Sequence, residues 1–188
     1  SWTNTFTQYY QDQLLSNRLH NLPQTAKQQP VILTVHGFGS SPFEWKDLHH
    51  YFYQKTNLIS HVFLGCHENL NHFENSCWQD WLKPICNEYQ ALVNAGFEHI
   101  ILVGCSTGAT LILQGLLNRC FSPNLALKDI VLVDCLIKPR SFYLNRINLY
   151  HPIIFSPSVC LTPEEQDHWL PIRPKKALLE LQTLFKTT

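Results

Sequence analysis

The sequence contains no methionine, no long apolar run and no excess of either charge. Its apolar stretches all fall short of the roughly 20 residues that a membrane-spanning helix requires. The 14 basic residues balance the 14 acidic ones, so no overall field attracts nucleic acid or an anionic membrane. The opening residues, SWTNTFTQYYQDQLL, lack the basic start and the apolar core of a signal peptide. We therefore expect a cytoplasmic protein with no nucleic-acid partner and no transmembrane segment.

Neither the cysteines nor the histidines follow the spacing of a disulfide framework or a metal site. The cysteines number seven, an odd count, and no two form a Cys-x-x-Cys pair. Cys105, Cys120 and Cys135 lie within or beside apolar segments, which is typical of reduced, buried thiols in a cytosol. His67 and His72 are five residues apart, which places them about 140° apart around a helix and not on one face. The sequence therefore predicts reduced cysteines and no metal site.

Short apolar segments rich in β-branched residues alternate with segments of helical spacing. Four of the apolar segments are expected to be strands buried on both faces, namely Val31–Val35, Val62–Leu64 with its flanks, Ile100–Val103 and Ile130–Val133. The helical segments are Pro42–Gln54, Ser76–Ala95 and Thr107–Leu117. Strands that alternate with helices form a mostly parallel sheet covered on both faces. The 188 residues therefore predict an α/β fold with a doubly wound, mostly parallel sheet.

A proline-rich region breaks this alternation after the fourth expected strand. It runs from Arg140 to Pro174 and is followed by KKALLELQTLFK, whose apolar residues recur at helical spacing. We interpret this part of the chain as a cap over the carboxyl edge of the sheet. The expected organisation is an α/β core over residues 1–139, incomplete at its C-terminal side, and a cap or lid insertion over residues 140–188.

The segment ILVGCSTGATLILQGLL joins an expected strand to an expected helix through a Gly-x-Ser-x-Gly turn. Ser106 lies at the apex of this turn, which is too tight for side chains at Gly104 and Gly108. Strain of this kind exposes the hydroxyl, and the helix N-terminus behind it favours developing negative charge. A phosphate-binding glycine loop is the structural rival, but no lysine follows and Gly-x-Gly-x-x-Gly is not satisfied. The pattern therefore predicts that Ser106 is a nucleophile.

A second glycine-containing turn follows the first expected strand. The segment VILTVHGFGSSPFEW places His36, Gly37, Phe38 and Gly39 directly after that strand. A backbone N–H of this turn and the N–H of Thr107 would form an oxyanion hole for a tetrahedral intermediate. Because His36 precedes the serine and belongs to this turn, we expect its ring to anchor the loop and not to act as the catalytic base.

The segments HGFGSSPFEW, WQDW and LVGCSTGATL together resemble the α/β-hydrolase superfamily, in its carboxylesterase, monoacylglycerol lipase and lysophospholipase branch. The likeness runs from about Val31 to Lys138. It implies an α/β-hydrolase-like fold and a serine hydrolase that needs no cofactor and no metal. The implied nucleophile is Ser106, and the implied oxyanion donors are the amides of Phe38 and Thr107.

The resemblance also implies a substrate class. It points to carboxylic esters, such as an acyl glycerol, a lysophospholipid-like ester or a short to medium acyl ester, cleaved through an acyl-enzyme. The apolar residues of the expected cap helix in KKALLELQTLFK suggest that the hydrophobic part of the substrate is an acyl chain. The chain departs from the family at one turn, where Gly65-Cys66-His67 stands in place of the usual Gly-His-Gly.

A catalytic serine needs a histidine to accept its proton and a carboxylate to orient that histidine. In this superfamily both follow the serine, in the order acid and then histidine, each after a further strand. Only one clear strand follows the serine in this sequence. We therefore expect that the acid and the histidine lie beyond Thr188. The competing interpretation is an internal triad, with Asp134 as the acid and His151 or His168 as the base.

Two other functions share these sequence features. A non-catalytic protein of the same fold would bind a small molecule or a partner in an intact pocket and leave Ser106 unreactive. A thioesterase or an acyltransferase would use the same nucleophile, but it would accept thioesters or pass the acyl group to an acceptor other than water.

Overall fold

A computed structural model describes residues 13–137, 153–155 and 162–188 of the chain. Four parallel strands form its main sheet, in the order β2-β1-β3-β4. They are β1 (Val31–Val35), β2 (Ile59–Val62), β3 (Ile100–Cys105) and β4 (Leu127–Val133). The chain passes from β1 to β2 on one side and then crosses to β3 on the other, so the strand order reverses at β1. In open α/β sheets, ligands bind in the crevice at the carboxyl ends of the strands where such a reversal occurs.

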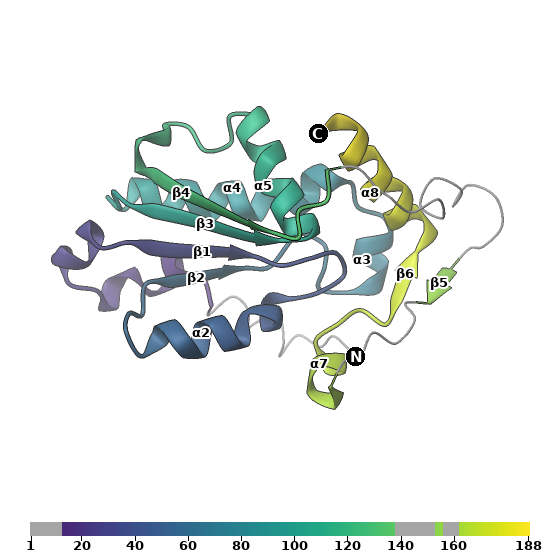
Figure 1. Cartoon of the computed structure of the whole chain (residues 1–188), viewed down its shortest axis with the longest axis horizontal. Helices are drawn as coiled ribbons and strands as arrows, with labels where there is room; N and C mark the ends of the chain where they lie inside the picture. The colour runs from purple at the N-terminus through teal and green to yellow at the C-terminus, as the bar shows by residue number, and fades with distance from the viewer. Residues whose placement is uncertain (1–12, 138–152, 156–161) are drawn as a thin grey trace.

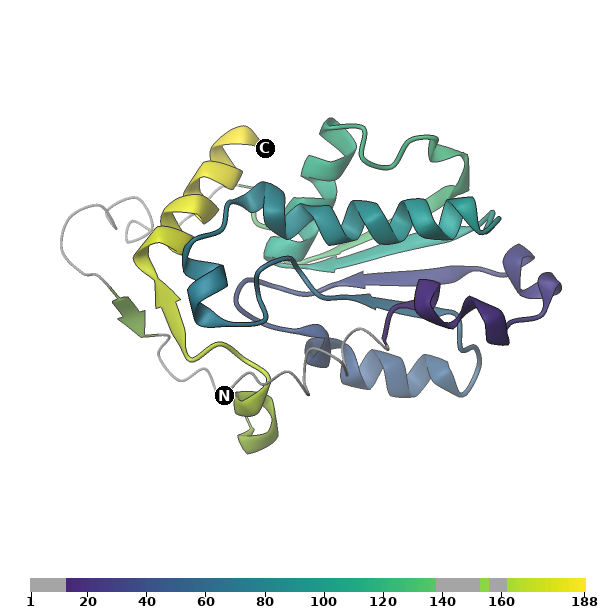
Figure 2. The same ribbon diagram turned by 180° about the vertical axis from the view of Figure 1, so that it is seen from behind.

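Helices cover both faces of the sheet (Figures 1 and 2). On one face, α2 (Lys46–Tyr53) packs over a small cluster formed by Ile32, Trp45, Ile59 and Val103. On the other face, α4 (Trp78–Asn94) and α5 (Thr107–Leu117) enclose the larger core. Because successive side chains of a strand point to opposite faces, each central strand contributes to both sides. The predicted α/β fold with a doubly wound, mostly parallel sheet is confirmed.

The starts of two helices follow local sequence signals. The Ser41 hydroxyl accepts a hydrogen bond from the Phe43 N–H (3.3 Å). Pro42 then opens the 3-10 turn η3 (Pro42–Trp45), which leads directly into α2. This arrangement confirms the predicted helical segment that begins at Pro42, since proline at the first turn needs no N–H donor there. The bounds of α5 also agree with the prediction.

Pro84 lies inside α4, and the helix continues through it. Because proline has no N–H, the carbonyl oxygen of Asp80 loses its usual helical partner. Gly65 packs against this carbonyl, and a Cβ built on Gly65 would lie 1.9 Å from Asp80 O. The Gly65 N–H donates to Trp81 O at 3.4 Å. The glycine that opens the sequence GCHEN is therefore required by the close approach of α4.

The C-terminal part of the chain lies at the carboxyl edge of the sheet (Figure 1). Its elements are β5 (Ile153–Phe155), α7 (Pro163–Asp167), β6 (Ile172–Pro174) and α8 (Lys175–Thr187), with β5 and β6 antiparallel to each other. The apolar face of α8 enters the larger core, to which it contributes Ala177, Leu181, Leu184 and Phe185. The division into a core over residues 1–139 and a cap over residues 140–188 stays a prediction, and α8 shares its hydrophobic core with α4 and α5.

The expectation that Ile130–Val133 is a strand buried on both faces is wrong. Ile130 is 37% exposed, Val131 46% and Val133 46%. The reason is that β4 stands at the edge of the sheet and pairs only with β3 among the strands that the structure describes. The sequence pattern of apolar residues is that of a covered parallel strand, but among its described residues only Leu127 and Leu132 pack against the larger core.

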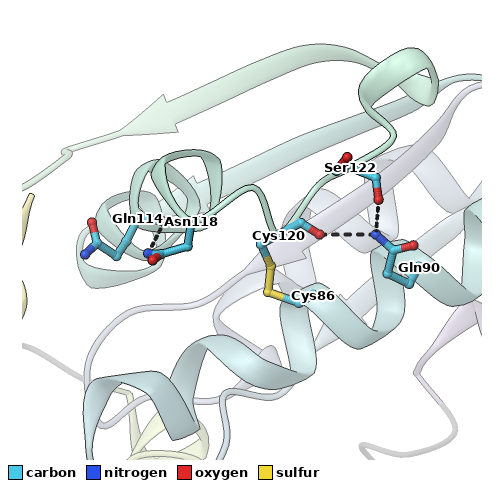
Figure 3. The surroundings of a disulfide bond; sticks show 6 residues. All are labelled: Cys86, Gln90, Gln114, Asn118, Cys120 and Ser122. Carbon is cyan, nitrogen blue, oxygen red and sulfur yellow. Dashed lines mark hydrogen bonds between the residues drawn. A yellow bond between two sulfur atoms is a disulfide. The ribbon is translucent and has the colours of Figure 1, made fainter.

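A disulfide joins Cys86 of α4 to Cys120, just after α5 (Figure 3). The two cysteines are 34 positions apart in sequence, and their Cα atoms lie 5.4 Å apart. Beside the disulfide, Gln90 Nε2 donates to the carbonyl oxygens of Cys120 (3.2 Å) and Ser122 (2.7 Å). The expectation of a reduced Cys120 is therefore wrong. Sequence spacing did not reveal the pair because it forms only when α4 and α5 pack side by side.

The remaining described elements are short. They are η1 (Leu15–Asn21), η2 (Gln24–Gln28), α3 (Leu70–Glu74) and η4 (Asn124–Ala126). Among the described residues, no helix has both the length and the apolar character that crossing a membrane would require.

Candidate active site

Ser106 occupies the turn between β3 and α5 in a strained backbone conformation. Its φ is +53° and its ψ is −119°, a region that residues other than glycine rarely adopt and that costs about 1–3 kcal/mol. The Ser106 N–H donates to Val133 O (2.9 Å), and the Ser106 carbonyl accepts from the Thr110 N–H (3.2 Å). The turn is thus held between the end of β4 and the first turn of α5, with the serine at the carboxyl edge of the sheet.

The glycines on either side of Ser106 leave no room for a side chain, as predicted. A Cβ on Gly108 would lie 2.4 Å from Val35 O and 2.5 Å from His36 O. A Cβ on Gly104 would lie 2.8 Å from two backbone atoms of Ala109. Both distances are far below normal contact, so the close packing of β1, β3 and α5 depends on glycine at these two positions.

The turn after β1 lies directly beside Ser106. A Cβ built on Gly37 would lie 3.6 Å from Ser106 Cβ and 3.7 Å from Cys105 O. The amides of Phe38 and Thr107, the two proposed oxyanion donors, have no hydrogen-bond partner within the part of the chain that the structure describes. The Gly37 N–H, in contrast, is occupied, because it donates to Glu44 Oε2 (2.7 Å). Of the two neighbouring amides in this turn, only that of Phe38 is available to a ligand.

The His36 ring anchors this turn, as expected. The Leu64 N–H donates to His36 Nε2 (3.0 Å), so that nitrogen carries no proton. The proton must then be on Nδ1, which donates to Gly37 O (2.8 Å). Burial, with a smaller contribution from His67, lowers the pKa of His36 well below 6.5. The ring is therefore neutral and both nitrogens are occupied, which excludes His36 as a base for Ser106.

The His67 ring packs edge-to-face near the ring of Phe38. It is fully buried, its Nδ1 bonds to Gly65 O (3.0 Å), and burial lowers its pKa to about 3. Its ring centroid lies 6.4 Å from that of Phe38 and 4.5 Å from that of Phe73. His67 is therefore a core residue behind the oxyanion turn, and its Nε2 has no hydrogen-bond partner in the described residues.

Arg173, which sequence reasoning missed, brings a positive charge to the same turn. It is only 8% exposed, and its guanidinium packs so closely on Gly39 that a Cβ there would lie 2.8 Å from Arg173 Cζ. Next to it, the Leu170 N–H donates to Gly39 O (2.9 Å). Burial lowers the pKa of Arg173 to about 10, so it remains a cation at neutral pH. No described carboxylate forms a salt bridge with it.

Glu44 was also missed, although it lies within the segment HGFGSSPFEW. The signal that could have found it is the Ser-Pro helix start, which folds Glu44 back over Gly37. Part of the Glu44 side chain is exposed, yet desolvation of the carboxyl raises its pKa against the effect of the Gly37 hydrogen bond. It lines a cavity of about 80 Å³ together with Ser40, Ser41, Phe43, Glu165, His168 and Trp169.

The described residues do not bring the candidate acid, Asp134, together with a candidate base. Asp134 follows β4 with φ +48° and is exposed. Together with Glu44 it adds to burial in raising the pKa of the Cys105 thiol to about 11, so Cys105 is not a thiolate at neutral pH. His168 stacks on Phe43, with ring centroids 3.9 Å apart. His151 lies outside the described residues. The structure does not join Asp134 to any described histidine.

No group of three or more histidine, cysteine or acidic side chains within the described ranges is placed to hold a metal ion. His67 is buried among aromatic rings, whereas the His72 side chain is largely exposed and contacts Glu68. His67 precedes α3 and His72 lies within it, so the helical spacing assumed for the two histidines does not apply.

The sequence matches no family model and no curated protein. The structure is similar to one from the metagenome-derived lipolytic enzymes LipS and LipT, with a TM-score of 0.69 and 18% identity over 84% of this chain. The chain spans 64% of the length of that structure. It is also similar to tomato methylketone synthase I complexed with 2-tridecanone, with a TM-score of 0.51 and 14% identity over 72% of this chain and 53% of that one. At this level of identity the likeness shows the fold, and the chain has an open, mostly parallel α/β sheet of the α/β-hydrolase type.

Proposed function

We propose that this chain carries the nucleophile of a serine hydrolase that cleaves carboxylic esters, and that the nucleophile is Ser106. The observation that carries the proposal is the strained Ser106 turn beside the His36–Gly39 turn, with no hydrogen-bond partner for the amides of Phe38 and Thr107 among the described residues. The two turns follow adjacent strands at the point where the strand order reverses, which is where ligands of open α/β sheets bind.

In the proposed reaction, Ser106 Oγ attacks the ester carbonyl and loses its proton to a base. The carbonyl oxygen becomes an oxyanion, which the Phe38 and Thr107 N–H groups stabilise without reorganisation. The N-terminus of α5 and the cation of Arg173 both favour negative charge at this place. The alcohol leaves with a proton, and water then hydrolyses the acyl-enzyme to the carboxylic acid and free Ser106.

The base is a histidine other than His36 and His67, whose rings are buried and neutral. His168 and His151 are the candidates within the chain, with Asp134 as the candidate acid. The histidine could also come from a further segment whose strands pair with the exposed edge of β4. Asp134 directly follows β4, so such a segment would lie beside it. This third arrangement corresponds to the order of acid and histidine in the superfamily that the sequence resembles.

The proposed substrates are esters with an apolar acyl group, such as acyl glycerols, lysophospholipid-like esters or short to medium acyl esters. The description of one structural neighbour as lipolytic supports this class. The other neighbour binds 2-tridecanone, a molecule with a long apolar chain. Both resemblances support a site that accepts an apolar chain next to a carbonyl group.

A non-catalytic binding protein is the second candidate function. It is favoured by one observation, namely that no described acid–histidine pair reaches Ser106. Such a protein would keep the turn geometry and bind a small molecule without forming an acyl-enzyme.

Labelling with a fluorophosphonate probe separates these functions. Intact mass is measured before and after labelling, with Ser106→Ala as the control. A serine hydrolase gains one adduct that the variant does not, and a panel of ester, thioester and amide substrates then identifies the acyl bond. A folded protein that gains no adduct would exclude the hydrolase and leave the binding protein.

A further inference from the structure

The carboxylate of Glu44 makes a direct contact with the turn that holds the proposed oxyanion donor. Its Oε2 accepts the Gly37 N–H at 2.7 Å. Gly37 directly precedes Phe38, so this bond fixes the peptide plane next to the one that carries the Phe38 N–H. Gly37 itself has no side chain to limit its backbone, and an amide without an acceptor here would leave the turn freer to rotate.

The second carboxylate oxygen of Glu44 lies near Gly37, on which the Ser106 side chain also packs. A Cβ built on Gly37 would lie 3.5 Å from Glu44 Oε1 and 3.6 Å from Ser106 Cβ. The two atoms are therefore no more than about 7 Å apart. Glu44 thus stands at the edge of the space in which the tetrahedral intermediate would form, close enough for its charge to act on that intermediate.

From these contacts we infer that Glu44 is a positioning residue of the proposed active site, which holds the Gly37 N–H so that the Phe38 N–H stays directed at the oxyanion. The inference rests on the proposed function of Ser106. The turn requires an acceptor oxygen at position 44 for the Gly37 N–H, and it does not require the negative charge of the carboxylate.

The surroundings of Glu44 explain why the acceptor and the charge have opposite effects. No described cation forms a salt bridge with Glu44, whereas Glu165 and His168 line the same cavity and Asp134 acts with Glu44 on Cys105. A second negative charge near a developing oxyanion is unfavourable. Desolvation disfavours the charged carboxylate and raises the pKa of Glu44, against the effect of the Gly37 hydrogen bond. The neutral amide of glutamine offers the same acceptor oxygen without any charge.

Two substitutions separate the acceptor from the charge. Glu44→Ala removes both, and Glu44→Gln keeps the acceptor alone. Asp47→Asn is the matched control, because Asp47 is an exposed acid three residues further along the same helical segment. Each variant is first checked for an unchanged thermal unfolding midpoint.

Hydrogen exchange of a peptide covering residues 36–39 reports on the turn whether or not the protein is catalytic. We expect Glu44→Ala to speed exchange at the Gly37 N–H, which loses its acceptor, by about tenfold or more, and Glu44→Gln and Asp47→Asn to leave it unchanged. Unchanged exchange in Glu44→Ala would overturn the inference, even if the wild-type protein gave no fluorophosphonate adduct and the proposed function failed.

The rate of fluorophosphonate labelling and the hydrolysis of a short ester give the second readout. Loss of a whole oxyanion donor costs about 10²–10³ in kcat, so a misplaced donor in Glu44→Ala should cost about tenfold or more, with KM unchanged. Glu44→Gln should stay within about threefold of wild type. If Glu44→Gln is as slow as Glu44→Ala, the acceptor is not what matters and the inference is wrong.

Discussion

The protein should lose stability steeply between pH 7.5 and 5.5, because three histidines are buried as neutral rings. His36 and His67 are 0% exposed and His61 is 3% exposed. Burial lowers the pKa of His61 and His67 to about 3, and that of His36 well below 6.5. In the unfolded chain these rings take up a proton as the pH falls through 6.5. The unfolded state then binds more protons, so the free energy of unfolding decreases as the pH decreases.

The magnitude follows from the difference in proton binding. At pH 5.5 a ring with an unfolded pKa of about 6.5 favours unfolding by about 1.4 kcal/mol, and at pH 7.5 by almost nothing. Three rings give a loss of about 4 kcal/mol, a large part of the roughly 5–15 kcal/mol that stabilises a typical domain. Glu44 acts in the opposite direction, because its raised pKa favours the protonated folded state as the pH falls, and it subtracts from this loss.

Urea unfolding at pH 7.5 and at pH 5.5 measures this difference directly. In His67→Gln, which retains two of the three rings, the loss should fall to about 3 kcal/mol. The exposed His50 provides the control, because His50→Gln should leave the difference unchanged. Equal stability at the two pH values would show that the three rings are not buried in their neutral form.

Three further predictions test the packing. Gly108→Ala should cost about 3 kcal/mol, near the top of the range for overpacking, because its Cβ would lie 2.4 Å from a backbone oxygen. In thermal unfolding this is a drop of roughly 6–12 °C, whereas Gly37→Ala, with Cβ contacts of 3.5 Å or more, should change the midpoint little. Replacing both Cys86 and Cys120 by alanine should lower the free energy of unfolding in urea by about 4 kcal/mol, because the disulfide closes a loop between residues 34 positions apart. Reduction of the wild-type protein should lower it by the same amount. Val35→Ala, at a side chain that is 0% exposed, should lower the free energy of unfolding by about 2 kcal/mol, and Val131→Ala, at 46% exposure, by well under 1 kcal/mol. Similar losses in the two variants would mean that Val131 is covered.

The Ser106 turn could be predicted because its constraints are local. A strand, two glycines and a helix start within a few residues of each other specify the conformation, and the structure places the serine at φ +53° as such a turn requires. Most strands and helices around it were found for the same reason, since the period of apolar residues is a property of each segment alone. The exception is β2, which spans Ile59–Val62 and so lies in the N-terminal flank of the predicted segment Val62–Leu64.

The features that the sequence did not reveal depend on contacts between distant segments. Val131 and Val133 belong to an apolar pattern that is the same for a covered and an uncovered strand, so their exposure depends on what packs beside β4. The Cys86–Cys120 disulfide needs two helices to lie side by side. Arg173 reaches Gly39 only because the C-terminal segment folds back onto the first strand's turn.

The contact between Leu170 and Gly39 has a consequence for the order in which the protein folds. These residues are joined by a 2.9 Å hydrogen bond across most of the chain, and closing so long a loop carries an entropic cost that local contacts avoid. The hydrogen bonds of the Ser106 turn reach only to Thr110 and Val133, which are much closer in sequence, and so the turn can form earlier. We therefore expect the central sheet to be recovered first on refolding and reactivity towards the fluorophosphonate probe to return later, with the docking of the last segment.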